Sequence, residues 1–131
     1  MKLVPEPVGL NAEFYAYCAA GELRFQRCTV CGTWRHPPRA RCAVCGSDQS
    51  EWALATGDGK VYSWTITHRA IDPGFADEVP YAVVVVEMDE GPRLVGNLRE
   101  LAPSELSLGL PVQVVFEKVS SQVALTHFGP R

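Results

Sequence analysis

The chain has 131 residues, of which 47% are hydrophobic, and it carries a formal net charge of −3 at pH 7. This length supports one ordinary globular domain, or a small module attached to one. The longest apolar block, Tyr81 to Val86, has the length of a strand, so the sequence contains no candidate for a membrane-spanning helix. The N-terminal segment lacks the long apolar core of a signal peptide, and we therefore expect a reducing, cytoplasmic setting.

The charge is unevenly distributed along the chain. Residues 24 to 45 contain five arginines and no acidic residue, whereas the remainder carries seven basic and fifteen acidic residues. A basic segment beside an acidic body favours a local anion site over a general nucleic-acid surface. The same arginines, if simply solvated, would balance the net negative charge of a zinc ion held by four thiolates. Both interpretations stay open at this point.

Residues 1 to 22 are predicted to form an extended arm followed by a short helix. Two prolines in the first ten residues favour the arm, Asn11 is a candidate N-cap, and Gly21 is placed to end the helix. One side of this helix is apolar and carries Phe14, Tyr15, Tyr17 and Cys18. Such a helix packs on its own domain or docks on a partner. Cys18 stands alone, and we expect it to be a small buried residue, not a ligand or a nucleophile.

Residues 23 to 52 contain the strongest motif of the chain. Two Cys-x-x-Cys pairs, each followed by glycine, are separated by ten residues: Cys28, Cys31, Cys42 and Cys45. Four thiolates at this spacing can converge on one tetrahedral metal ion, so we predict a zinc ribbon with one structural zinc. A rubredoxin-type iron site or two disulfides would use the same cysteines. A four-cysteine site leaves no open coordination position, which places any chemistry elsewhere. His36 is expected to be a surface group and not a ligand.

Residues 53 to 131 are rich in β-branched and aromatic residues, which predicts a mainly β fold. The expected strands are Lys60 to Thr67, Tyr81 to Met88, Arg93 to Leu98, Val112 to Val119 and Val123 to Phe128. A helical turn is expected near Pro103, between the third and fourth strands. Five strands with this insertion fit an OB-fold barrel, whose small interior would be filled by side chains. The block from Tyr81 to Val86 is expected to be buried on both faces.

Evidence for catalysis in this sequence is weak. The candidate acid or base groups are His68, Asp72, Asp77, Glu78 and His127, which are types that surface loops commonly carry. We expect a protein without catalytic activity of its own. Nucleic-acid binding is the main alternative, because OB barrels bind single strands, but the barrel half of this chain is acidic.

The motifs resemble one family of zinc-ribbon plus OB-fold proteins, first catalogued as a domain of unknown function and later associated with acyl-CoA enzymes. The similarity runs from residue 11 to about residue 118. It is carried by Gln26 to Gly32, His36 to Arg39 before the second Cys pair, Gly59 to Thr65, Glu87 to Arg93, and Gly109 to Val112. The resemblance implies an accessory subunit of thiolase-like enzymes, such as aldolases and acyltransferases, or of acyl-CoA hydratases. It implies help in binding acyl-CoA, with steroid side-chain degradation, lipid metabolism and secondary metabolism as settings.

On this basis we predict a subunit that joins a hetero-oligomer with a thiolase-like or hydratase enzyme and helps to position acyl-CoA. The arginines that we expect to contact CoA phosphates are Arg35, Arg39, Arg41 and Arg69. The side chains that we expect to contact the partner are Phe14, Tyr15, Tyr17 and Phe75. A nucleic-acid-binding module is the runner-up, and an independent hydrolase or hydratase is the third possibility.

Overall fold

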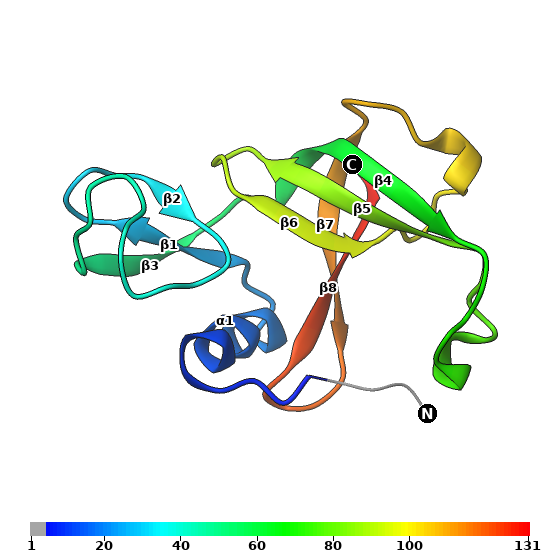
Figure 1. Ribbon diagram of the computed structural model, residues 1–131, viewed down its shortest axis with the longest axis horizontal. Coiled ribbons are helices and arrows are strands. Elements are labelled where there is room, and N and C mark those ends of the chain that lie inside the picture. Colours follow the sequence, from blue (N-terminus) through cyan, green and yellow to red (C-terminus); the bar gives the residue numbers. More distant parts are fainter. Residues whose placement is uncertain (1–4) are drawn as a thin grey trace.

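The computed structural model describes residues 5–131, which form a zinc-ribbon-like sheet, a helix and a larger curled sheet (Figure 1). The small sheet and the long loop after β4 lie towards opposite ends of the long axis, and the helix lies below the junction of the two sheets. One apolar core continues from the helix through the junction into the larger sheet, with Phe14, Phe25 and Phe128 among its members. The predicted mainly β fold is confirmed. No helix within residues 5–131 is long and apolar enough to cross a membrane.

The N-terminal helix α1 spans Gly9–Ala19. It begins two residues before the predicted cap, because Val8 already has the extended backbone of an N-cap residue. Its end agrees with the prediction: Gly21 has φ +81° and its N–H donates to the carbonyl of Cys18, a geometry that favours glycine. Cys18 is buried in the core, and burial raises the pKa of its thiol to about 12, which keeps it protonated and inert.

The small sheet has the strand order β2-β1-β3. Its strands are β1 (Arg24–Cys28), β2 (Trp34–Arg35) and β3 (Ser50–Leu54). Antiparallel pairing of β1 with β2 sets Gln26 opposite Arg35. Pairing of β1 with β3 extends β1 to the first cysteine, where Cys28 lies opposite Ser50.

The larger sheet has the order β6-β5-β4-β7-β8. Its strands are β4 (Asp58–Thr67), β5 (Tyr81–Met88), β6 (Arg93–Asn97), β7 (Pro111–Lys118) and β8 (Ala124–Pro130). Two short 3-10 helices, η1 (Pro73–Phe75) and η2 (Pro103–Glu105), lie in the connections. All five strands fall within a few residues of their predicted positions. Hydrophobic alternation and the turn residues between the strands are sufficient to place them.

The sheet curls until its two edge strands, β6 and β8, meet. They are joined by an isolated parallel bridge between Leu98 and Phe128, so the barrel is closed at one point and not along a full ladder. Gly96 makes this approach feasible, since a Cβ at that position would lie 2.6 Å from the carbonyl oxygen of Thr126.

The outer faces of strands β4 and β5 are partly exposed. Along β5 every second residue is buried while Val83 and Val85 are only half-buried, so the outer face of this strand is partly open and the expectation of burial on both faces was wrong. A register shift between Val61 and Ser63 in β4 places Tyr62 at a bulge. Tyr62, Trp64 and Ile66 are 47%, 37% and 36% exposed, and they do not join the core.

Candidate functional site

The four cysteines of the small sheet converge as their spacing predicted. Their sulfur atoms all lie within 4.8 Å of one another. The Sγ atoms of Cys28 and Cys45 are 3.5 Å apart, and those of Cys31 and Cys42 are 3.6 Å apart. A tetrahedral zinc with Zn–S bonds of about 2.3 Å requires sulfur atoms roughly 3.8 Å apart, so the thiolates fit the ion. Cys28 and Cys42 are buried, whereas Cys31 and Cys45 face solvent.

The backbone around the two Cys pairs is folded for thiolate ligands. The N–H of Cys31 points at Cys28 Sγ (3.5 Å) and that of Val44 points at Cys42 Sγ (3.4 Å). These donors stabilise negative charge on sulfur. Gly32 and Gly46, with φ of +79° and +77°, turn the chain after each pair. The five cysteines form no disulfide, which agrees with the metal and not with the two-disulfide alternative.

Arg35 lies inside the ribbon and not on its surface. It is only 7% exposed, its Nε donates to Gln26 Oε1 (3.0 Å), and its Nη2 donates to the carbonyl of Arg39 (2.9 Å). The Gln26 oxygen also accepts the backbone N–H of Arg39 (2.7 Å). This correction removes Arg35 from the candidate anion contacts, because its guanidinium is occupied in holding the loop between the Cys pairs.

The other three candidate arginines do not form one cluster. Arg39 and Arg41 are exposed on the ribbon, where the guanidinium of Arg41 donates to the carbonyl of Gly46 (3.0 Å). Arg69 is exposed just after the end of β4, and the loop that follows β4 extends to the opposite end of the long axis from the ribbon (Figure 1). Any anion held by the ribbon would therefore meet Arg39 and Arg41 without Arg69.

The candidate partner contacts also divide into two groups. Phe14 is 4% exposed and stacks on Phe25 in the core, so it supports α1 and cannot contact a partner directly. Tyr15 and Tyr17 are partly exposed on α1, and Phe75 packs on Tyr81 (ring centroids 5.9 Å apart) in the loop after β4. The aromatic spacing on α1 identified the helix face but could not separate its core residues from its accessible ones.

Two of the five candidate acid or base residues lie in a charged cluster. His127 on β8 is 6% exposed, and its Nε2 lies 2.7 Å from Glu117 on β7. Arg99 lies 3.7 Å from both Glu78 and Glu117, and 3.3 Å from the His127 ring. Arg99 thereby connects the end of the long loop to the barrel. Burial lowers the pKa of His127 despite the neighbouring carboxylates.

The remaining three candidates have no such surroundings. His68 and Asp77 are exposed, and Asp72 accepts the N–H of Gly74 (2.8 Å) to cap η1. Arg99 and Glu117 were missed from the sequence, because their meeting depends on the pairing of β7 with β8 and on the path of the long loop.

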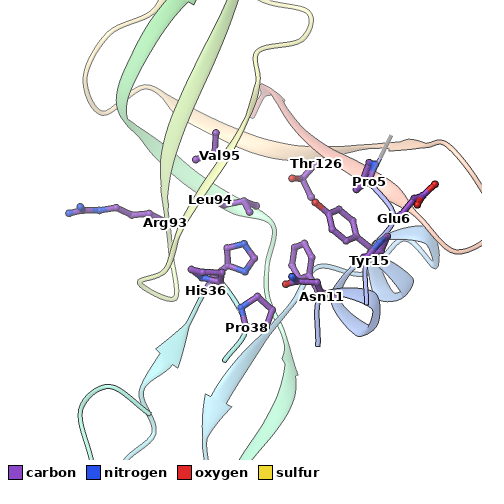
Figure 2. A pocket seen from close by; sticks show the side chains of 13 residues that line it. Pro5, Glu6, Asn11, Tyr15, His36, Pro38, Arg93, Leu94, Val95 and Thr126 are labelled. Carbon is purple, nitrogen blue, oxygen red and sulfur yellow. The ribbon is translucent and has the colours of Figure 1, made fainter. Parts of the chain in front are cut away.

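A cavity of about 510 Å³ opens where α1, the ribbon and β6 meet, and we call it the junction pocket (Figure 2). Its lining includes Phe14, Tyr15, His36, Pro38, Leu94 and Thr126. His36 packs against both Phe14 and Phe25, with ring centroids 4.7 and 5.4 Å away. Burial there lowers its pKa to about 4, so the imidazole is neutral at physiological pH. His36 is thus a wall of the pocket, in contrast to the expected surface group, and it lies outside the cluster of potential metal ligands.

Comparison with known proteins places this geometry in context. Residues 16–51 match the model of the ChsH2 rubredoxin-like zinc ribbon domain, and residues 52–117 match that of the ChsH2 C-terminal OB-fold domain. With the four converging thiolates, the ribbon match assigns one structural zinc to this chain.

Three relatives illustrate the similarity. A probable enoyl-CoA hydratase alpha subunit of Thermomonospora curvata is 38% identical over 92% of this chain, which spans only 37% of that protein. A DUF35 domain-containing scaffold protein of Methanocaldococcus jannaschii is 32% identical over 79% of this chain and 70% of its own length. A chain of a solved structure described as Ltp2-ChsH2(DUF35) aldolase is 37% identical, with TM-score 0.86 over 97% of this chain and 98% of that chain. From these matches, the chain belongs to the ChsH2/DUF35 family of zinc-ribbon and OB-fold proteins.

Proposed function

We propose that this chain is a non-catalytic accessory subunit that docks on a thiolase-like enzyme and helps to position its acyl-CoA substrate. The observation that carries the proposal is the full-length similarity to a chain of an aldolase structure. Relatives named as scaffold proteins and as a hydratase alpha subunit support the same role. A zinc ion closed by four thiolates would shape the ribbon without taking part in a reaction.

The ribbon supplies a candidate surface for the phosphates of CoA. Arg39 and Arg41 are exposed within a segment, residues 24 to 45, that contains no acidic residue. Guanidinium groups bind phosphate through charge-assisted hydrogen bonds. Arg69 would have to meet a different part of the substrate or the partner, because it follows β4 in the barrel and does not belong to the ribbon.

Purification of the tagged chain from its own host tests the partner. We expect a thiolase-like subunit in stoichiometric amount. Recovery of nucleic acid instead would favour the runner-up function, and turnover of an acyl-CoA by the purified chain alone would favour an independent enzyme.

Acyl-CoA affinity of the assembled complex tests the ribbon surface. We expect the double substitution R39E/R41E to weaken binding at least about tenfold, since each charge-assisted hydrogen bond contributes about 1.5–3 kcal/mol. K60E/K118E is the matched control, because Lys60 and Lys118 are exposed on the barrel and a double reversal there changes the net charge equally. An unchanged affinity in R39E/R41E would remove CoA binding from the ribbon and leave the docking role intact.

A further inference from the structure

Strand β6 has one backbone edge that faces away from β5. The carbonyl of Pro92 accepts the N–H of Met88 (2.9 Å), and the N–H of Leu98 donates to Ala82 (3.0 Å). In an antiparallel pair, alternate residues direct their backbone groups to the same neighbour. The even-numbered residues of this strand therefore face β5, and the odd-numbered residues Arg93 and Val95 face outward.

Strand β8 covers this outward edge only at one end. The N–H of Arg99 donates to the carbonyl of Phe128 (2.7 Å), next to the single parallel bridge at Leu98. Towards Arg93 the two strands diverge, and the first half of β6 points to the ribbon and α1 (Figure 1). Within the described residues, the ladder between β6 and β8 does not continue past this bridge. An open strand edge of this kind is a template for pairing with another strand.

The junction pocket lies directly against the open edge. Arg93, Leu94 and Val95 line it from one side, and Figure 2 shows His36 and Pro38 of the ribbon facing Leu94 from the other. Apolar walls beside an exposed backbone edge suit an extended peptide, because its backbone can pair with the edge while alternate side chains enter the pocket. His36, whose pKa of about 4 keeps it neutral, adds no charge to that wall.

The surrounding charge distinguishes between possible occupants. The side chain of Arg93 is 53% exposed; its guanidinium lies 3.8 Å from Glu87 and 3.8 Å from the centroid of the Tyr62 ring. On the neighbouring ribbon, Arg39 and Arg41 are exposed, whereas Arg35 is buried and Arg24 is paired with Glu22. An acidic segment is complementary to this surface, whereas a second copy of this chain would bring the same basic ribbon against itself.

We propose that the Arg93–Val95 edge and the junction pocket bind an extended, acidic segment of the partner enzyme by β-strand addition. The identity of the partner rests on the proposed function, but the mode of binding rests on the open edge and the pocket. The backbone groups of Arg93 and Val95 pair with the incoming strand, and an apolar side chain of that strand enters the junction pocket beside His36 and Pro38, which are partly exposed.

Amide hydrogen exchange on the complex purified from the host, compared with the free chain, tests the edge. We expect exchange at Arg93 and Val95 to be fast in the free chain and at least about tenfold slower in the complex, while Leu94 and Gly96 are protected in both. Equal exchange at Arg93 and Val95 in the two states would overturn the inference, even if a thiolase-like subunit is present and the proposed function stands.

A pair of substitutions at one position tests the hydrogen bond itself. V95P deletes an N–H that β5 does not use, and an edge strand tolerates proline in that orientation. V95T keeps the N–H and the β-branched shape. We expect V95P to weaken partner binding at least about tenfold, and V95T to leave it within about threefold, by titration calorimetry with the purified partner. Equal affinities of V95P and V95T would contradict strand addition.

The composition of the purified sample separates the two proposals. The amides of Arg93 and Val95 could be protected by an acidic strand of a partner that is not thiolase-like. That result would support strand addition and overturn the proposed function. Protection in a sample that contains only a homodimer would overturn the acidic partner strand in favour of a second copy. Recovery of the chain as a monomer without any partner would overturn both.

Discussion

Gln26 holds the buried arginine of the ribbon in place. Its amide oxygen accepts hydrogen bonds from the Nε–H of Arg35 and the backbone N–H of Arg39, whereas Arg35 Nη1 is buried without a hydrogen-bond partner among the described residues. Replacing Gln26 by leucine keeps the volume but leaves these donors without an acceptor. We expect Q26L to lower the free energy of unfolding by about 2–3 kcal/mol, because unsatisfied buried donors, a cation above all, are costly.

Urea unfolding of the zinc-loaded protein measures this difference. Q122L is the matched control, since Gln122 is exposed, and it is expected to stay within about 0.5 kcal/mol of the unsubstituted protein. If Q26L were as stable as Q122L, the buried network would not contribute to the stability of the ribbon.

His36 makes the stability of the chain depend on pH. Burial against Phe14 and Phe25 lowers its pKa from 6.5 to about 4, so the folded state favours the neutral ring. As the pH falls, His36 takes up a proton in the unfolded chain before it does so in the folded chain. Its contribution to the free energy of unfolding is therefore complete above pH 6.5 and is lost as the pH falls towards 4. We expect a loss of about 2 kcal/mol across this range, after allowing for partial exposure to solvent.

The substitution H36F isolates this effect. It keeps an aromatic ring in the same contacts and removes the titration, so we expect a shallower fall of stability between pH 6.5 and 4. Zinc release by acid affects both proteins and cancels in the comparison. If the free energy of unfolding fell equally steeply with pH in H36F and in the unsubstituted protein, protonation of His36 would not be coupled to unfolding.

At the scale of the elements, the metal organises the small sheet. Its strands have two to five residues each and leave Trp34, Trp52 and Ala53 only half-buried. Such a module depends on its metal for folding. On removal of zinc by a chelator, we expect amide protection to be lost in residues 24–54, while β5 in the barrel remains protected. Restored protection after addition of zinc is the control, and a ribbon that stays protected without metal would contradict a structural role for it.

Sequence patterns gave the local elements more readily than their mutual contacts. The spacing of the cysteines predicted the metal site, and hydrophobic alternation predicted all five barrel strands. The burial of Arg35 was not predictable in the same way, because it depends on cross-strand pairing with Gln26, nine residues away. Strand β3 was missed because Ser50 to Leu54 has no clear alternation and exists by pairing with β1. Similarly, the open edge of β6 follows from where β8 crosses it and not from the residues of β6.

At the scale of the whole molecule, closure of the barrel rests on a short contact between β8 and the end of β6. Gly96 of β6 lies so close to β8 that an added Cβ would be 2.6 Å from the carbonyl oxygen of Thr126 and 3.2 Å from the Cα of His127. Both neighbours are backbone atoms of a paired strand, so they cannot move aside independently. Separation of β6 from β8 here would also disturb the bridge between Leu98 and Phe128.

We therefore expect G96A to lower the free energy of unfolding by about 2 kcal/mol or more, although alanine is ordinarily compatible with a strand. V95A, one residue earlier on the open edge, is the matched control. It should lower the free energy of unfolding by less than G96A does, because Val95 is 56% exposed. Denaturant unfolding of both variants gives the comparison. A G96A protein as stable as V95A would mean that the two edges are not held together at this point. In that case the barrel would open further towards the junction pocket, and the same two strands would offer a longer edge to a partner.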